Sequence, residues 1–215
     1  MATSQTPDLQ SRCELLRSLQ QPGAPLLLPN AWDVATARAV VAAGFPVVAT
    51  TSGGVAATLG YEDHEGAPAK EMLAAAARIA QGVEVPVTVD AEAGYGMEPA
   101  ELVAALRSVG AAGCNLEDSD YASGGLRDPD RHGAWLEAVR QAASEDDYPL
   151  VINARVDVFM SAFLAGAGPG TRRSSSPTLC GERMRTSKPA STACTRSACG
   201  RRARCAASSR RPAVR

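Results

Sequence analysis

The stretch PVTVDAEAGYG at residues 86–96 decides the fold, because it joins a short β-branched run to two carboxylates and a glycine-rich turn. The Val-Thr-Val run follows a proline and is too short for a helix, which predicts a fully buried strand of a parallel sheet. If strand geometry persists, the side chains of Asp90 and Glu92 point to the same side. Two carboxylates this close favour a cation between them, and such oxygen ligands suit Mg²⁺ or Mn²⁺. The alternative is a pair of solvated acids in a loop.

Apolar runs and helical segments alternate along the chain on both sides of this stretch. Strands are predicted at residues 25–31, 46–51, 86–90, 113–118 and 149–157. Helices are predicted at residues 7–20, 32–44, 67–82, 98–110 and 131–145. This alternation indicates a parallel α/β sheet or barrel, in which chemistry gathers at the carboxyl ends of the strands.

Polar or glycine residues follow every predicted strand. They are Asn30 and Asp33, residues 51–54, Asp90 and Glu92, Glu117 and Asp118, and Arg155 and Asp157. A buried structural strand needs no such ending, and the carboxyl ends of parallel strands meet at one edge of the sheet. The sequence therefore predicts a single active site assembled from five strand ends.

The residue types at this edge favour a small anionic ligand beside a metal ion. Asp90, Glu92 and Glu117 can share one divalent cation, some of them through water. Arg155 offers a planar fork to a carboxylate or phosphonate, and the Ser-Gly-Gly turn after Thr51 presents backbone N–H groups. Together they suit an α-keto acid and the stabilisation of an enolate.

Five motifs in the same order resemble the isocitrate lyase and phosphoenolpyruvate mutase superfamily. They are TSGG at 51–54, LGYED at 59–63, VDAEAGYG at 89–96, LED at 116–118 and ARVD at 154–157. The resemblance covers roughly residues 26–165. It implies a (β/α)₈ barrel of the TIM type, Mg²⁺, an enolpyruvate-type intermediate, and cleavage or rearrangement of a C–C or P–C bond. It also implies a homo-oligomer for full-length members.

The resemblance assigns a role to individual positions of this chain. The metal-site acids are Asp90, Glu92 and Glu117. The catalytic and substrate-binding positions are Asp63, Arg155, Thr51, Ser52 and Gly53. The resemblance thus implies a magnesium-dependent lyase or mutase-type enzyme for a small α-keto acid, 2-hydroxy acid or phosphonate.

The loop SDYASGGLRD at residues 119–128 narrows the branch of the superfamily. It lacks the cysteine and histidine of the lyase loop, which disfavours a thiolate acid or base, and it lacks the lysine and asparagine of the true mutases. NAWD at residues 30–33 resembles the phosphonomutase-like branch. His64 follows Asp63 and has two interpretations, a substrate-facing group or a solvated loop histidine. The glycines of the loop suit a mobile lid.

Composition changes abruptly near residue 170. Residues 1–170 hold 10 Lys and Arg against 22 Asp and Glu, whereas residues 171–215 hold 12 against 1. We interpret residues 1–170 as a partial barrel of about five of eight β/α units, and residues 171–215 as a disordered, arginine-rich tail. An out-of-frame translation explains the tail best, so the chain is expected to be truncated and either inactive as written or a non-catalytic remnant. The alternative is a basic arm that binds nucleic acid.

No apolar run approaches the roughly 18 to 20 residues that span a bilayer, so we expect no membrane association and a cytoplasmic protein. Cys13 and Cys114 are too few for a disulfide framework, and we expect both to be reduced and buried.

Overall fold

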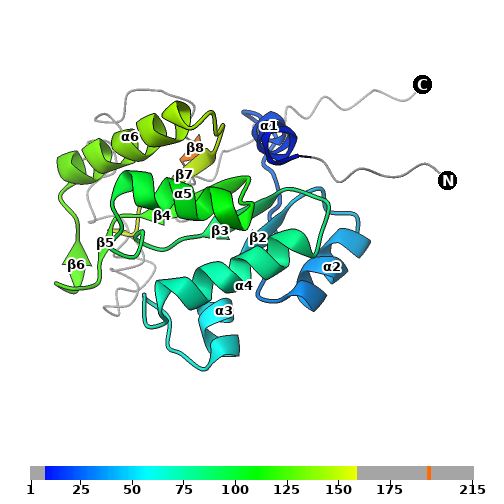
Figure 1. Ribbon diagram of the computed structural model, residues 1–215, viewed down its shortest axis with the longest axis horizontal. Helices are drawn as coiled ribbons and strands as arrows, with labels where there is room; N and C mark the ends of the chain where they lie inside the picture. The colour runs from blue at the N-terminus through cyan, green and yellow to red at the C-terminus, as the bar shows by residue number, and fades with distance from the viewer. Residues whose placement is uncertain (1–7, 159–192, 195–215) are drawn as a thin grey trace, which may run out of the picture.

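The computed structural model describes residues 8–158 and 193–194, and within them helices and strands alternate (Figure 1). The helices are α1 (Leu9–Leu19), α2 (Val34–Ala42), α3 (Ser52–Leu59), α4 (Ala69–Gln81), α5 (Pro99–Val109) and α6 (Pro129–Glu145). The strands are β1 (Asn30–Ala31), β2 (Val48–Thr50), β3 (Val87–Asp90), β4 (Gly113–Glu117), β5 (Ser119–Asp120), β6 (Gly125–Leu126), β7 (Val151–Arg155) and β8 (Ala193–Cys194).

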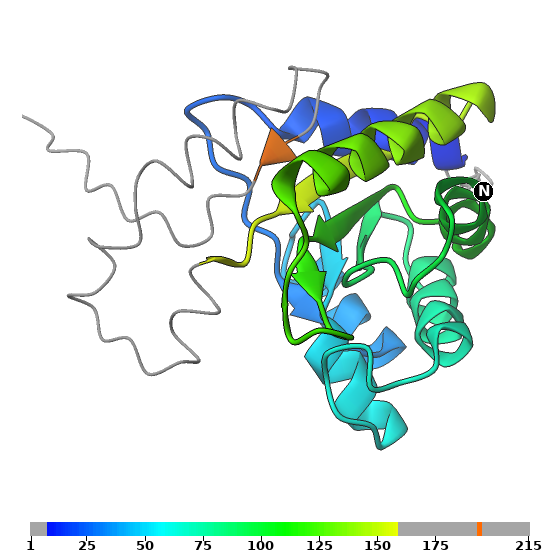
Figure 2. The ribbon, with the colours of Figure 1, turned by 90° about the vertical axis from the view of Figure 1, so that its left-hand side faces the viewer.

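One sheet holds the strands β1-β2-β3-β4-β7-β8 in that order, and all of its neighbours are parallel. The predicted α/β class is confirmed, with all five expected strands side by side in chain order as in a barrel of the TIM type. Helices α4, α5 and α6 lie next to one another along one face of the sheet (Figures 1 and 2).

The core lies between this sheet and its helices, and it explains why the central strands are almost wholly apolar. All four residues of β3 are buried, including Val87 and Val89. Large side chains from the helices fill the space above them: Ile79 of α4, and Leu102 and Leu106 of α5, are each at most 1% exposed. A parallel sheet covered in this way reads as continuous apolar runs in the sequence.

Helix α1 packs across the amino ends of the strands. Its Leu16 lies against Gly113, the first residue of β4, where an added Cβ would come within 2.7 Å of the leucine Cδ2. Its Arg12 is 8% exposed and donates to the carbonyl oxygens of Ala80 and Val83 at 3.2 and 3.3 Å. These contacts close the bottom of the sheet and leave its carboxyl edge for the site.

Three local predictions need correction. The strand predicted at 25–31 is ordered as a strand only at Asn30–Ala31, because the prolines at 25 and 29 cannot donate to a ladder. The turn predicted after Thr51 is the start of helix α3, which we did not predict. The loop at 119–128 contains the antiparallel hairpin β5–β6.

The predictions for residues 171–215 lie almost entirely outside the described residues. The exception is β8, whose two residues pair with Asn153 and Ala154 of β7, which differs from our expectation of a tail without strands. An edge strand with unpaired backbone groups accepts such a segment readily. Within residues 8–158 and 193–194, no helix has the length and apolar character needed to cross a membrane.

Candidate active site

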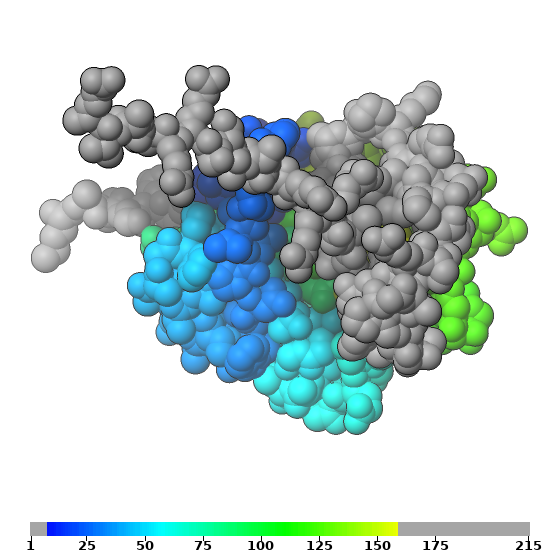
Figure 3. All heavy atoms as spheres, turned by 180° about the vertical axis from the view of Figure 1, so that it is seen from behind, coloured from blue at the N-terminus to red at the C-terminus, as the bar shows by residue number. Residues whose placement is uncertain are grey.

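Three neighbouring strands deliver charged side chains to one point at the carboxyl edge of the sheet. Asp90 ends β3, Glu117 ends β4 and Arg155 ends β7, and the register pairs Glu117 directly with Arg155. Asp90 and Glu117 are 9% and 1% exposed. Figure 1 shows α3 and the β5–β6 hairpin on the side of the sheet away from α1, and in Figure 3 the cyan atoms around α3 lie on the opposite side of the molecule from the blue atoms of α1.

Arg155 binds carboxylates on both sides. Its Nε and Nη2 donate to the two carboxylate oxygens of Asp157 at 2.7 and 2.8 Å, which is a bidentate pair. Its Nη1 lies 2.6 Å from Oε2 of Glu117 and 3.8 Å from Oδ1 of Asp90. Burial opposes the charge of Arg155, but its pKa is raised because these three carboxylates outweigh burial. Arg155 therefore stays a cation and holds the acids of three strand ends together.

Glu117 is the most enclosed acid of the site. Burial raises its pKa to about 7, although the Tyr121 hydroxyl and Arg155 both favour the charged form. The Tyr121 hydroxyl donates to Oε1, while Oε2 faces Arg155. Both oxygens of Glu117 thus have partners in the described structure.

One carboxylate oxygen of Asp90 accepts a hydrogen bond, and the other accepts none from the described residues. Its Oδ2 accepts from the backbone N–H of Ser52 at 3.1 Å, and its own N–H donates to the Thr50 hydroxyl at 2.9 Å. Its Oδ1 is buried without a hydrogen-bond partner among the described residues, and Arg155 at 3.8 Å is beyond hydrogen-bond reach. A buried carboxylate oxygen left in this state is costly unless a ligand meets it.

Glu92 lies at the site although it follows the end of β3, so the alternation of side chains along a strand does not explain its position. β3 ends at Asp90, and Glu92 adopts a left-handed conformation with φ of 49°. The premise of persistent strand geometry was therefore wrong, although Glu92 is only 2% exposed. Its Oε1 accepts from the backbone N–H of Glu65 at 2.7 Å. Burial raises the pKa of Glu92, and the charges of Asp63 and Asp90 act in the same direction.

Helix α3 and the loop after it form the next wall. Thr51 is the N-cap of α3, and Ser52 and Gly53 are its first residues, so the predicted amide nest is the amino terminus of a helix. Gly53 lies against Asp63, where an added Cβ would be 2.7 Å from the Asp63 Oδ2. The other oxygen of Asp63, Oδ1, is buried without a hydrogen-bond partner within residues 8–158.

The β5–β6 hairpin contributes a tyrosine that sequence reasoning missed. Besides Glu117, the Tyr121 hydroxyl lies 3.4 Å from Nδ1 of His64, and the two rings are 5.4 Å apart. Figure 2 shows the hairpin extending from the sheet toward the loop that follows α3. Arg127, after the hairpin, donates to the Ala93 carbonyl at 2.8 Å. Tyrosine is neither the cysteine nor the histidine that marks the lyase loop, so the motif comparison did not identify it.

Some strand-end residues serve the fold instead. The Asp33 side chain accepts from the N–H of Thr36 at 2.7 Å and forms a capping box at the start of α2, so it is not part of the charged cluster. Cys114 lies within β4 and is fully buried, and burial raises its pKa to about 12. It remains a thiol near neutral pH and does not supply a thiolate base.

The carboxylates of Asp90, Glu92 and Glu117 suit a hard divalent cation that keeps several of its water ligands. Within the described residues, no three His, Cys, Asp or Glu side chains converge closely enough to enclose a metal ion together. Mg²⁺ needs no such enclosure, because it commonly binds through one or two carboxylates and retains several waters. The open Oδ1 of Asp90 is the oxygen that meets this requirement, and Glu92 and Glu117 are buried nearby.

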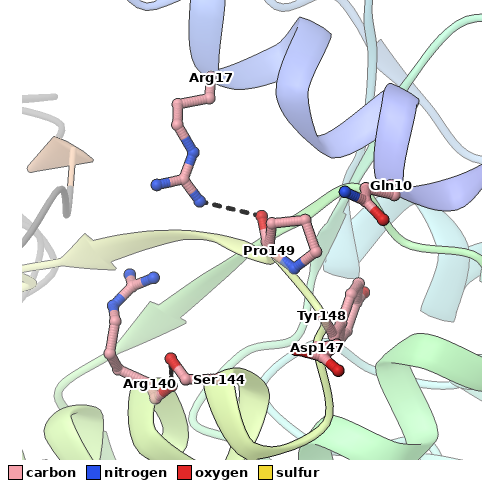
Figure 4. Close-up of a pocket in the computed structure, with 7 residues that line it drawn as sticks. All are labelled: Gln10, Arg17, Arg140, Ser144, Asp147, Tyr148 and Pro149. Carbon is pink, nitrogen blue, oxygen red and sulfur yellow. Dashed lines mark hydrogen bonds between the residues drawn. The ribbon is translucent and has the colours of Figure 1, made fainter.

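A cavity of about 570 Å³ opens at the amino ends of the strands and is lined by residues of α1, α6 and the loop into β7 (Figure 4). Arg17 donates to the carbonyl oxygen of Pro149 at 3.0 Å, and Arg140 to that of Leu150 at 3.3 Å. Burial and the neighbouring Arg17 lower the pKa of Arg140. This cavity lies at the opposite end of the sheet from the acids.

Comparison with known proteins matches this chain to one family over most of its length. Residues 16–175 match the family model described as phosphoenolpyruvate phosphomutase. The uncharacterized protein Rv1998c of Mycobacterium tuberculosis is 38% identical over 141 residues, which are 66% of this chain and 52% of that protein. A protein of Corynebacterium glutamicum named "Probable 2-methylisocitrate lyase 2" is 38% identical over 93 residues, or 42% of this chain and 30% of that protein.

A solved structure from Burkholderia cenocepacia J2315, named a "putative phosphonomutase", resembles this chain with a TM-score of 0.66 and 42% sequence identity. The match covers 70% of this chain and 62% of that one. The chain spans about half the length of the M. tuberculosis relative and less of the C. glutamicum protein.

Proposed function

Because this chain belongs to the phosphoenolpyruvate phosphomutase family, within the phosphoenolpyruvate mutase and isocitrate lyase superfamily, we propose that its carboxyl-edge site is a magnesium site for a small acid. The substrate class is an α-keto acid, a 2-hydroxy acid or a phosphonate, and the reaction cleaves or rearranges a C–C or P–C bond. The observation that carries this proposal is the buried Oδ1 of Asp90, which lies within a cluster of acids and has no hydrogen-bond partner among the described residues.

Asp90 would hold Mg²⁺ through its open Oδ1, and Glu92 and Glu117 would be the other acids of the metal site. When bound, the ion supplies Lewis-acid polarisation of the substrate oxygens and stabilises enolate charge. This assignment follows the preference of Mg²⁺ for few carboxylates and many waters. Mn²⁺ accepts the same oxygen ligands and serves as a substitute.

The substrate carboxylate or phosphonate is assigned to Arg155 and the amino terminus of α3. Arg155 has a planar fork suited to either anion, and its present partners are carboxylates of the protein itself. The first backbone N–H groups of α3 carry the positive end of the helix dipole. That of Ser52 already donates to Asp90, so we assign the anion to the N–H of Gly53. Thr51 stands at the N-cap of the same helix and completes this wall.

Asp63 is assigned to the proton transfer. Its Oδ1 is buried and has no partner among the described residues, so it is the oxygen that accepts a proton from a substrate hydroxyl. Gly53 permits the approach of this carboxylate to α3, because any side chain there would collide with it. Since Cys114 is held as a thiol within β4, the thiolate chemistry of the lyases is not part of the proposal.

Turnover of three acids by the full chain tests the proposal. Oxaloacetate, 2-methylisocitrate and phosphonopyruvate are each incubated with Mg²⁺, and with a chelator as the control. We expect magnesium-dependent loss of at least one, together with Mn²⁺ binding detected by electron paramagnetic resonance. Metal binding without turnover of any of the three would identify a non-catalytic remnant, and absence of both would overturn the proposal.

A further inference from the structure

The loop that carries Asp63 is held in a conformation that its residues rarely adopt. His64 and Glu65 are consecutive left-handed residues with φ of 66° and 57°, and neither is glycine. Across from them, Glu92 and Tyr95 are also left-handed, at 49° and 56°. Such residues persist only where the surrounding contacts fix them, and they gather at functional sites.

Glu65 makes the contacts that fix both segments. Its backbone N–H donates to Oε1 of Glu92 at 2.7 Å. Its own carboxylate accepts, through Oε1, from the backbone N–H of Tyr95 at 2.8 Å. The two hydrogen bonds run in opposite directions between the same two segments, so each holds the other in register.

We propose that Glu65 is a positioning residue, which locks the Glu92 carboxylate and the Asp63 loop into one arrangement. This inference rests on the proposed function. Glu65 lies two positions from Asp63, and its backbone N–H binds Oε1 of Glu92, one of the acids assigned to the proposed metal site. Partners of this kind, one step removed from a metal ligand, determine how well the ligand is aimed.

The side chain of Glu65 and its backbone have separable roles. The hydrogen bond to Glu92 comes from the backbone, so substitution does not delete it directly. What Glu65→Ala removes is the acceptor for Tyr95, which leaves that N–H unpaired and releases the strained loop. Glu65→Gln keeps an oxygen acceptor of the same length, so it restores the arrangement without the charge.

Mn²⁺ binding by the full chain, measured by electron paramagnetic resonance, tests this inference without any assay of turnover. We expect Glu65→Ala to weaken the Kd for Mn²⁺ by about 10-fold or more, and Glu65→Gln to stay within about twofold of the unsubstituted chain. Glu62→Ala, an exposed acid of the same loop, is the matched control and should change nothing.

Each outcome has a distinct meaning. An unchanged Kd in Glu65→Ala, with Mn²⁺ still bound, overturns the positioning role and leaves the proposed function standing. If the unsubstituted chain binds no Mn²⁺, the proposed function itself fails. Should Glu65→Ala not fold, Glu65→Asp replaces it, because a side chain one methylene shorter cannot reach the Tyr95 N–H from the same backbone. A normal Kd in Glu65→Asp overturns the inference equally.

Discussion

The charged side chains at the two ends of the sheet have different kinds of partner. At the carboxyl end, Asp90, Glu117 and Asp157 surround Arg155, and Oδ1 of Asp90 and Oδ1 of Asp63 have no hydrogen-bond partner among the described residues. At the amino end, Arg17 donates to the carbonyl oxygen of Pro149 in the loop into β7 (Figure 4), and Arg140 donates to that of Leu150 in the same loop. Charged side chains that hydrogen-bond to main-chain carbonyls stabilise the fold. Carboxylates that cluster together and keep an oxygen without a hydrogen bond are instead able to bind a ligand.

The largest expected effect is on turnover, and it separates the two ends most sharply. Asp90→Ala removes the open oxygen and should lower magnesium-dependent turnover by roughly 100-fold or more. Arg17→Gln, at the amino end, should leave turnover within about twofold. Steady-state rates of both variants, with Asp130→Ala as an exposed control, check this prediction. Equal losses in Asp90→Ala and Arg17→Gln would remove the distinction between the two ends.

The pH dependence of stability should also arise at the carboxyl end. The pKa of Glu117 is raised from 4.5 to about 7 in the folded chain, so folding favours its protonated form. The stability contributed by that form is complete below pH 4.5 and is lost as the pH rises through about 7. Glu117→Gln should flatten this part of the profile, a difference on the order of 2 kcal/mol.

Urea unfolding of the parent chain and of Glu117→Gln, at intervals between pH 4.5 and 8 without metal, measures this difference. The arginines of the amino end do not titrate in that range, so Arg17→Gln is the control and should reproduce the parent profile. Parallel profiles for the parent and Glu117→Gln would contradict the raised pKa.

A third prediction concerns the packing of helix α1 against the amino ends of the strands. Gly113→Ala places a Cβ 2.7 Å from the Leu16 Cδ2 and 2.8 Å from the carbonyl oxygen of Val151. The leucine can rotate, but the carbonyl belongs to the neighbouring strand, so the sheet must shift. We expect a loss of roughly 1 to 2 kcal/mol in the free energy of unfolding. Gly133→Ala, which meets nothing within 4 Å, is the matched control for chemical denaturation.

The carboxyl ends of parallel strands lie at one edge of the sheet, and this predicted from sequence which residues lie together. It did not predict the backbone conformation that brings each side chain to the site. Asp90, Glu117 and Arg155 end regular strands, so their convergence follows from the period of the sheet alone. Glu92 lies beyond the strand in a left-handed turn. The local sequence does not predict a left-handed conformation for a glutamate.

Two further features depended on long-range contacts. The partners of Glu65 are 27 and 30 positions away, so its role cannot be seen within its own motif. Tyr121 lies four residues after Glu117, but its contact depends on the fold of a hairpin that the glycines suggested only as a mobile loop. Helix α3 was missed because two glycines near its start disfavour a helix.

The smallest effect on the free energy of unfolding is expected at Arg140, because its positive charge is buried without full hydrogen bonding. Its Nη2 is buried without a hydrogen-bond partner among the described residues, its bond to Leu150 is long at 3.3 Å, and Arg17 lies nearby. Arg140→Met keeps the apolar length of the side chain and removes this charge. The free energy of unfolding should therefore change by less than about 1 kcal/mol, in either direction.

Arg12→Met is the matched comparison, because Arg12 makes two hydrogen bonds to carbonyls and is 8% exposed. Its loss leaves both carbonyls unpaired and should cost about 1 to 3 kcal/mol in chemical denaturation. If Arg140→Met proves the more damaging, the amino-end cavity requires its guanidinium. The amino end would then also hold a charged group for a ligand.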